Sequence, residues 1–440
     1  MKVFDRDDVQ LCASLLSVAT TPDDALIAWS ALRARHPDLV GIVCLDSYKR
    51  SALPLSVKKY TKPPLDYLVP YFDTEQIYFL EDELLREMFH SNNVDFGVDY
   101  TLMFDTNIAS YINKLVRGES LGALQREIVT LVDEILHDDL NFDSLFYMVE
   151  NVKDIFHLLE ESQPSKIEFW KSLNKEFRSN QVSLQLFRSI DCKEYKRTSN
   201  PKPVFTYRNA ARRAIDFSYD FYASDHGKEM VLDFVVVQRL ILLHIIGMVK
   251  IQLLSNKSAK NKMSDYFEYI NTVVGAYFDR ESIIAHKYFS DRRNVGILHK
   301  MQKGMPTTRL LRKLDNIAWD MAAPRFMEKL IPSMGGSREG RYFVPMFLSF
   351  DTKLRELLSL FPVKGVIYSK SGGELIPLPK INTIDYFKLH GCEKGLEYLY
   401  SDSVKTERRS RKKPTRLSIH ELIKCEYREL RHVINPDKKE

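Results

Sequence analysis

Cysteine is scarce in this chain of 440 residues, and no two of its five cysteines form a C-x-x-C pair. An even set at regular spacing would indicate a disulfide framework, and paired spacings would indicate a structural zinc site. The five are instead scattered, at Cys12, Cys44, Cys192, Cys392 and Cys425. We therefore expect reduced thiols in a cytoplasmic protein, with neither a disulfide scaffold nor a zinc site.

The motifs of several enzyme classes are also absent. The sequence contains no H-E-x-x-H of zinc proteases, no G-x-x-x-x-G-K-[ST] phosphate loop and no G-x-S-x-G nucleophile elbow. Ser371, Gly372 and Gly373 are better explained as the turn of a small hairpin within 364–377. His244 lies in an apolar helical stretch, where we expect a core histidine with a local partner.

The longest apolar stretch, Met230 to Leu254, is interrupted by charge. It contains Asp233, Arg239, His244 and Lys250, and a central Asp or Arg costs roughly 2.5–3.5 kcal/mol on membrane insertion. A buried core helix is therefore the better interpretation. The first ten residues carry acids where a signal peptide would be apolar, so we expect neither a leader nor a membrane association.

The net charge of +5 is small, and its location is more informative than its size. Residues 401–440 contain twelve Lys or Arg against seven Asp or Glu, so this tail carries the whole excess. Clusters of Lys and Arg could contact phosphates, although a solvated surface explains any single cluster as well. The clusters are Arg208 with Arg212 and Arg213, Arg292 with Arg293, and residues 408–413. Nearby tyrosines could stack on bases, but their helical spacing favours the core: Tyr207, Tyr219, Tyr222, Tyr277 and Tyr288.

Two aspartates stand where an apolar run gives way to a helical pattern. The run 102–104 ends at Asp105, and Asn107 is expected to cap the helix that follows. Much later, the run 346–350 ends at Asp351, which also precedes a helical pattern. Open α/β folds place their ligand sites at the carboxyl ends of strands. The two aspartates therefore suggest a carboxylate site for a hard divalent cation.

The order of the patterns predicts an α/β protein in five segments. These are an N-terminal α/β lead-in (1–98), the first half of a site domain (99–162), an all-helical insertion (163–309), the second half of that domain (310–380), and a basic linker with a C-terminal helix (381–440). Within them we expect a helix over 7–19, a helix starting at 21–24, a strand over 39–45, irregular structure over 62–72 and one helix over 141–161. A further helix over 310–330 is expected to break near Pro324.

Four motifs in this order resemble those of PIN-domain nucleases. They are DTN at Asp105, FYMVEN with Glu150, NIAWDMAAPRFME with Asp320, and FLSFDTKLREL with Asp351. The resemblance is to large bacterial PIN-like proteins, and it implies a parallel sheet flanked by helices. It also implies that the four acids are the catalytic residues and hold Mg²⁺ or Mn²⁺, and that Thr106 or Asn107 orients them.

The same resemblance implies a metal-dependent nuclease, with RNA more than DNA as the substrate. It further suggests a bacterial toxin or antiphage defence effector with a neutralising protein partner. A non-catalytic interaction protein with a degenerate nuclease fold, and a nuclease that cuts DNA, remain as alternatives. Each acid could also be an ordinary helix cap or surface residue, as could Asp46.

The third acid of the set is ambiguous. Asp315 lies five residues before Asp320, about 140° away around an α-helix. The two cannot both face one metal from an unbroken helix. The motif favours Asp320, with Asp315 as its substitute.

Overall fold

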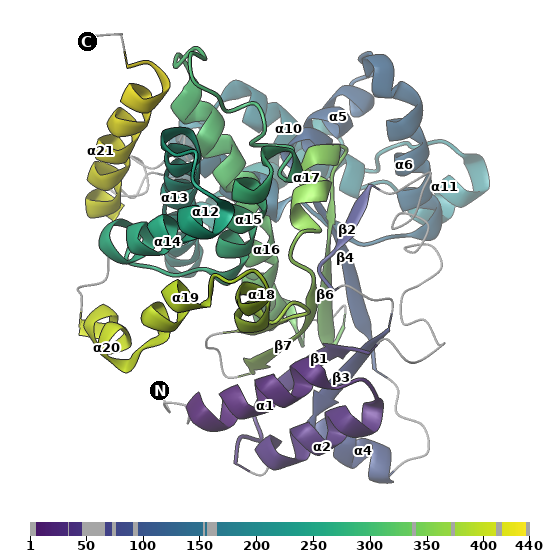
Figure 1. The fold of residues 1–440 in the computed structure, drawn as a ribbon. Coiled ribbons are helices and arrows are strands. Elements are labelled where there is room, and N and C mark those ends of the chain that lie inside the picture. Colours follow the sequence, from purple (N-terminus) through teal and green to yellow (C-terminus); the bar gives the residue numbers. More distant parts are fainter. Residues whose placement is uncertain are drawn as a thin grey trace. The chain divides into compact units, whose positions relative to one another are not determined.

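The structure, a computed structural model, combines helices with two small sheets (Figure 1). It describes residues 6–33, 35–45, 67–72, 76–90, 96–152, 155, 165–336, 340–370, 375–410 and 416–436. The chain forms two compact units. The first comprises residues 1–232, 325–350 and 363–378, and the second comprises 233–324, 351–362 and 379–440. The predicted mixed α/β class is confirmed, while the five predicted boundaries stay predictions.

The first sheet of the first unit contains the predicted parallel strands. Its order is β2 (Leu68–Pro70), β6 (Tyr342–Leu348), β4 (Val98–Phe104) and β5 (Phe142–Asp143). Strand β4 is parallel to both of its neighbours, and β2 joins the edge antiparallel to β6. All seven residues of β6 are buried, as expected for a parallel strand covered on both faces.

Two predictions for this sheet were wrong. Residues 68–70 were expected to be irregular, but they form β2, where Pro70 is tolerated because the strand lies at the sheet edge. The region 141–161 was expected to be one helix, but it starts with β5, and the helix α7 (Leu145–Asn151) follows. The apolar run there serves a strand and then a helix, which periodicity alone does not separate.

The second sheet of this unit has an antiparallel strand at its centre, which pairs with a neighbour on each side. Its order is β3 (Ile77–Glu81), β1 (Leu39–Cys44), β7 (Val363–Ser369) and β8 (Ile376–Pro379). Strand β1 pairs antiparallel with both β3 and β7. The strand predicted at 39–45 and the two strands of the predicted hairpin are confirmed. The turn at 371–373 and Asp46 lie outside the described residues.

One helix of the first unit starts at Pro22 with a clear capping signal. At Thr21, which precedes Pro22, the hydroxyl accepts from the Asp24 N–H and the Thr21 N–H donates to the Asp24 carboxylate. The helix predicted from 21–24 is thereby confirmed, and the helix predicted over 7–19 is observed at Arg6–Val18. In chain order the helices are α1 (Arg6–Val18), α2 (Pro22–Arg33), α4 (Asp82–His90), α5 (Thr106–Val116), η1 (Gly122–Leu124), α6 (Gln125–Asp138), α7, α9 (Lys166–Ser172), α10 (Lys175–Arg188), α11 (Cys192–Thr198) and α12 (Tyr207–Ala223).

The second unit is helical in its described residues. In chain order it contains most of α13 (Asp225–Leu254), α14 (Ala259–Tyr269), the π-helical turn η3 (Ile270–Val274), α15 (Asp279–Ser290), η4 (Arg292–Asn294), the first part of α16 (Leu310–Met334), α17 (Thr352–Leu358), α18 (Thr383–Leu389), α19 (Glu393–Tyr400), α20 (Asp402–Ser410) and α21 (Arg416–Ile434).

Helix α13 confirms the prediction of a buried core helix. Its segment Gly227–Leu254 is long and apolar enough to cross a membrane, but 72% of its most apolar window is buried inside the structure. His244 is fully buried, and its ring contacts the Tyr266 hydroxyl at 2.7 Å and the Ala276 carbonyl at 3.0 Å. The core histidine with a local partner is confirmed as well.

Two other predictions need correction. Helix α16 continues through Pro324 and is not interrupted there. The proline removes only one N–H from the helix, and the packing of the buried Ala323 and Phe326 on either side offsets that loss. The basic linker predicted around 405–416 is partly helical, because 405–410 belong to α20. Residues 411–415 lie outside the described residues.

Candidate functional site

Asp105 lies where the parallel strand β4 passes into α5. Its N–H donates to the Leu348 carbonyl at 3.1 Å, which extends the pairing of β4 with β6 by one residue. Only 4% of Asp105 is exposed, and the Ser349 hydroxyl donates to its carboxylate at 2.7 Å. The ends of two neighbouring strands thus bring an acid and a hydroxyl together inside the first unit.

The carboxylate of Asp105 does not cap the helix that follows it. Asp105 occupies the N-cap position with extended backbone angles, yet its side chain accepts no capping hydrogen bond from a backbone N–H of the first turn of α5. The prediction that Asn107 is the cap was wrong, because the helix already starts at Thr106. Asn107 is exposed, and its amide donates to the Asp105 carboxylate at 3.5 Å.

Glu150 reaches the same corner through Thr106. The Thr106 hydroxyl donates to the Glu150 carboxylate, and both residues are half-buried. Glu150 stands near the end of α7, directly after the buried Met148 and Val149. Two hydrogen-bonded pairs, Ser349 with Asp105 and Thr106 with Glu150, are thus joined by the peptide between Asp105 and Thr106, and we call these four residues the β4 corner. Two of the four acids predicted from the sequence belong to it.

The helix that carries Glu150 is fixed by its neighbours. The Tyr222 hydroxyl, from α12, donates to the Met148 carbonyl. The Asn180 amide, from α10, donates to the Tyr147 hydroxyl at 3.1 Å. Burial raises the pKa of Tyr147 well above its ordinary value. A rigid support of this kind is what a binding site needs to hold its ligands in one geometry.

Asp351 is arranged differently, although its sequence context is similar. It is exposed, it is the N-cap of α17, and its carboxylate accepts from the N–H groups of Lys353 at 2.8 Å and Leu354 at 3.2 Å. This is the ordinary capping arrangement of an aspartate. Asp351 belongs to the second unit, and its role as a metal ligand stays a prediction.

Helix α16 carries the remaining candidates, also within the second unit. The Asp315 carboxylate accepts from Arg239 at 2.6 Å and from Gln238 at 3.1 Å. Asp320 is half-buried, five residues further along the helix. The preference for Asp320 over Asp315 as a metal ligand stays a prediction. Among the described residues, no group of three or more Asp, Glu, His or Cys side chains that could hold a metal is found.

Two polar residues near the corner were not predicted from the sequence. Ser349 is fully buried, and its only signal is its position directly after the apolar run that ends at Leu348. Asp143 is paired with Met103 at the end of β5. Burial raises the pKa of Asp143 to about 7, and the nearby charge of Asp99 adds to the rise. The hydrogen bond from the Leu145 N–H and the charge of Arg188 lower the pKa, but by less. In the sequence, Asp143 could have been recognised as an acid directly before Ser144 at the start of a helix. The prediction of one long helix over 141–161 concealed this helix start.

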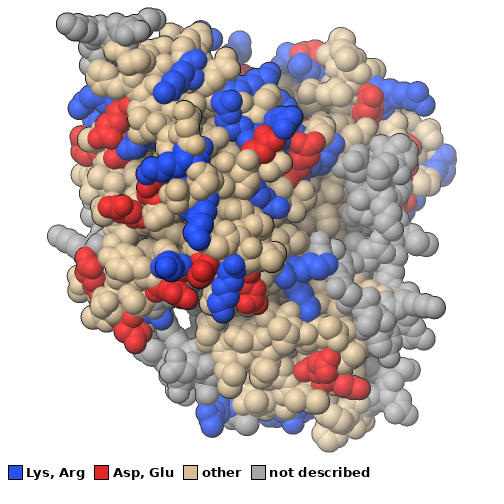
Figure 2. All heavy atoms as spheres, in the orientation of Figure 1, with Lys and Arg blue, Asp and Glu red and all other residues tan. Residues whose placement is uncertain are grey.

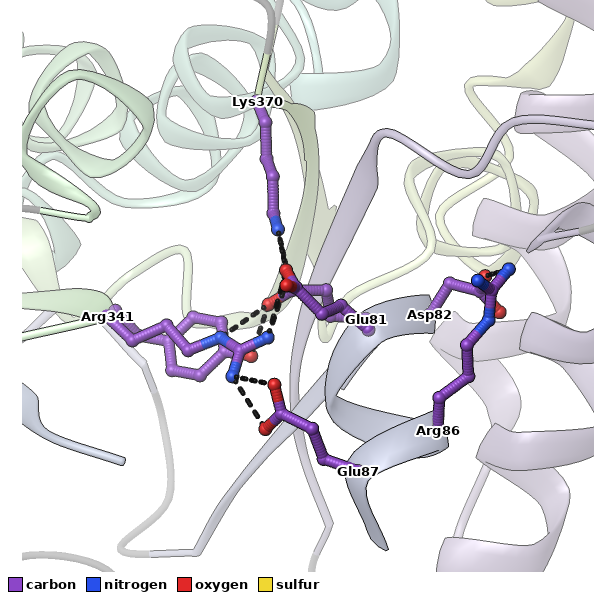
Figure 3. Close-up of polar contacts among 8 residues, drawn as sticks. Glu81, Asp82, Arg86, Glu87, Arg341 and Lys370 are labelled. Carbon is purple, nitrogen blue, oxygen red and sulfur yellow. Dashed lines mark hydrogen bonds and ion pairs between the residues drawn. The ribbon is translucent and has the colours of Figure 1, made fainter. Parts of the chain in front are cut away.

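A second polar cluster joins the two sheets of the first unit (Figure 3). Glu81, at the end of β3, is only 1% exposed and accepts hydrogen bonds from Arg341, Tyr342 and Lys370. Burial opposes ionisation, but these three donors hold the pKa of Glu81 below its usual range. Arg341 also bonds Glu87 at 3.0 Å. Arg341 and Lys370 each also pair with Glu83, at 3.3 and 3.2 Å, so the two cations are shared among three carboxylates and connect the two sheets.

No protein-family model, curated protein or solved structure matches this chain. The fold defines an α/β protein whose most distinctive polar group is the β4 corner.

Proposed function

We propose that this protein is a metal-dependent nuclease, an endoribonuclease that uses Mg²⁺ or Mn²⁺ at the β4 corner. The observation that carries the proposal is the Asp105 carboxylate. It is buried at the carboxyl end of a parallel strand pair, where α/β proteins bind ligands, and it does not cap its own helix. Burying a carboxylate costs free energy, and at Asp105 side-chain donors, Ser349 and Asn107, offset part of that cost in place of the N–H groups of the helix.

The donors at the corner fit a hard divalent cation. All of them are oxygen atoms, from the carboxylates of Asp105 and Glu150 and the hydroxyls of Thr106 and Ser349. Mg²⁺ is commonly held by one or two carboxylates, with water and substrate phosphates in its other positions. When bound, such a metal lowers the pKa of a water and neutralises charge on the scissile phosphate.

The residues of the corner have separate parts in this proposal. Asp105 and Glu150 bind the metal. Ser349 and Thr106 each donate a hydrogen bond to one of these carboxylates, and so fix the direction of the remaining lone pairs. The motif resemblance makes Asp320 and Asp351 candidates for further metal ligands. The same resemblance is the basis for proposing a preference for RNA, a toxin or defence role and a neutralising protein partner.

A cleavage assay with the purified full chain tests the proposal. The substrates are end-labelled single-stranded and double-stranded RNA and DNA, each incubated with Mg²⁺, with Mn²⁺ or with EDTA. We expect RNA to be cut with either metal and left intact with EDTA. Cleavage of DNA alone would favour the DNA-cutting alternative, and cleavage in EDTA would contradict a role for the metal.

A melting experiment tests metal binding without requiring any substrate. A ligand that binds only the folded chain at a hundred times its Kd stabilises it by about 2.7 kcal/mol. We therefore expect Mn²⁺ to raise the Tm of the wild-type chain, and not that of Asp105→Asn. If the wild-type Tm stays constant and no nucleic acid is cut, the protein is better described as a non-catalytic interaction protein.

A further inference from the structure

A segment of the second unit carries positive charge without any acid. From Arg292 to Leu314 the sequence contains seven Lys or Arg and no Asp or Glu. Figure 2 shows Lys and Arg side chains gathered in the upper middle of the face that it draws, with Asp and Glu side chains beside them. Five of the seven cations are exposed and make no ion pair with the part of the chain that the structure describes: Lys300, Lys303, Arg309, Arg312 and Lys313.

The acids that flank the segment already have partners. Asp291 pairs with Arg293 at 2.7 Å, and Asp315 pairs with Arg239 at 2.6 Å. The Glu356 carboxylate lies beside Gly296, since a Cβ atom built there would be 3.4 Å from it. Near the start of the segment, an acid can therefore compensate part of the positive charge. The uncompensated charge therefore lies over residues 300–313, which we call the 300–313 surface.

The 300–313 surface is fixed to helix α21. The Gly304 N–H donates to the Ile434 carbonyl at 2.8 Å, and the Asn435 amide donates to the Met305 carbonyl at 3.1 Å. The Tyr427 hydroxyl donates to the Thr307 carbonyl at 3.2 Å. Because its backbone is held at three points, the surface presents its cations in a defined arrangement. Such preorganisation lowers the entropic cost of binding a ligand.

Several of these cations occupy positions that cost stability. Arg309 has a φ of 64°, in the left-handed region that is unfavourable for residues other than glycine. Arg312 and Lys313 lie in the first turn of α16, where the helix dipole is positive and favours acids. The cost at Arg309 is steric and does not depend on its charge. The cost at Arg312 and Lys313 is electrostatic, and a polyanionic ligand would offset it.

We propose that the 300–313 surface binds the phosphate backbone of a nucleic acid without reading its bases. The segment 292–314 contains no Phe, Tyr or Trp, and its one histidine, His299, is half-buried with its ring bonded to the Gly296 carbonyl at 2.6 Å. It therefore offers no exposed aromatic ring for bases to stack on. Lys and Arg without aromatic partners contact phosphates, and such contacts are independent of sequence and sensitive to salt. The inference deepens the proposed function by naming where the RNA strand is held, but binding does not depend on the cleavage chemistry.

Binding is measured with the full chain in EDTA, which prevents metal-dependent cleavage. The probe is a fluorescein-labelled single-stranded RNA of mixed sequence, and the readout is anisotropy at several salt concentrations. The test variant combines Lys300→Gln, Lys303→Gln and Arg312→Gln. The control variant combines Lys260→Gln, Lys388→Gln and Lys394→Gln, which removes the same charge from exposed positions of the same unit.

We expect the test variant to bind RNA at least about tenfold more weakly, with a salt dependence reduced by about 2 in log–log slope, since each phosphate contact contributes about 0.7. The control variant should bind within about twofold of wild type. A charge-preserving variant, with Lys300→Arg, Lys303→Arg and Arg312→Lys, should do the same. The Tm of the test variant should stay constant or rise, because a cation leaves the start of α16.

Three outcomes would overturn the inference. One is unchanged RNA binding by the test variant, another is an equal loss in the control variant, and the third is binding of anionic phosphatidylserine vesicles but not of RNA. A chain that binds RNA through this surface and never cuts it would uphold the inference while the proposed nuclease fails. A chain that cuts RNA while the test variant binds normally would leave the nuclease proposal standing without this surface.

Discussion

At two points of the chain a buried strand is followed by an aspartate and then by a helix, and the two aspartates differ in what they contact. Asp351 is exposed, and its carboxylate accepts from two N–H groups of its own helix. Asp105 is buried, makes no capping bond, and accepts from Ser349 on the neighbouring strand. The same sequence pattern therefore produces an ordinary helix cap at one corner and a candidate ligand at the other.

The difference follows from the strands that precede the two residues. Beyond β4, the pairing with β6 continues to the Asp105 N–H, so Asp105 still belongs partly to the sheet and faces the next strand. Beyond β6, two residues separate Leu348 from Asp351, and the chain has left the ladder before the helix begins. A residue inside the ladder is directed by its neighbours, whereas one outside it is available to its own helix.

The substitution Asp105→Asn is expected to have the largest effect. It removes the charge that would bind the metal but keeps an oxygen that can accept from Ser349. We expect RNA cleavage to be abolished and the circular dichroism spectrum and Tm to remain close to wild type. Full cleavage by this variant across single-stranded and double-stranded RNA would contradict the role of Asp105.

A matched pair of threonine variants tests the next step. Thr106 follows Asp105 and donates to Glu150, while Thr352 follows Asp351 and is exposed at the start of α17. Loss of a residue that orients a metal ligand typically costs 10–100-fold in activity or affinity. We expect Thr106→Val to lose about that much cleavage or Mn²⁺ affinity. Thr352→Val should keep both, and equal losses in the two variants would remove the distinction between the corners.

The third strand-end acid, Asp143, makes a prediction about pH. Its pKa is about 7 in the folded chain and near 3.9 when unfolded. Between these values the unfolded chain binds fewer protons, so Asp143 makes the protein less stable as pH rises from about 4 to about 7. Asp143→Asn should remove this contribution. It should raise the unfolding free energy at pH 7 by at most roughly 2–4 kcal/mol.

Urea unfolding at several pH values measures this effect. The difference in stability between Asp143→Asn and wild type should be small near pH 4 and should grow toward pH 7. A difference that is constant over this range would show that Asp143 does not titrate as its burial indicates.

The smallest effect is expected at Asp351. Asn is as good an N-cap as Asp, whereas Ala leaves the N–H groups of Lys353 and Leu354 without their acceptor. We expect Asp351→Ala to cost about 1 kcal/mol of unfolding free energy and Asp351→Asn only a few tenths. Loss of cleavage by Asp351→Asn at unchanged Tm would show that this acid is a ligand as well as a cap, as the motif resemblance predicts.

The parts of the fold that could be predicted have strong local signals. The apolar runs at 39–45 and 102–104 form strands, and the helix start at Thr21 has its cap and its proline. Asp105 could be located because an acid directly after such a run stands out. His244 could be assigned to the core because an apolar helix surrounds it.

The remaining features depend on residues that are far apart in the sequence. Ser349 acts on Asp105 across 244 positions, and only the register of β4 with β6 brings them together. Strand β5 has two residues, too few for any periodicity. The contrast between Asp105 and Asp351 likewise depends on how far a ladder extends, which no local pattern encodes.

The pairing of β1 with β7, and of β4 with β6, has a consequence for biosynthesis. Each pair joins a strand made early to one made after residue 340, so the first unit cannot close until about 378 residues have left the ribosome. Until then the nascent chain holds apolar strands with open edges, which favours association with chaperones. A message truncated before residue 340 would yield a product that lacks β6 and β7, the partners of β4 and β1.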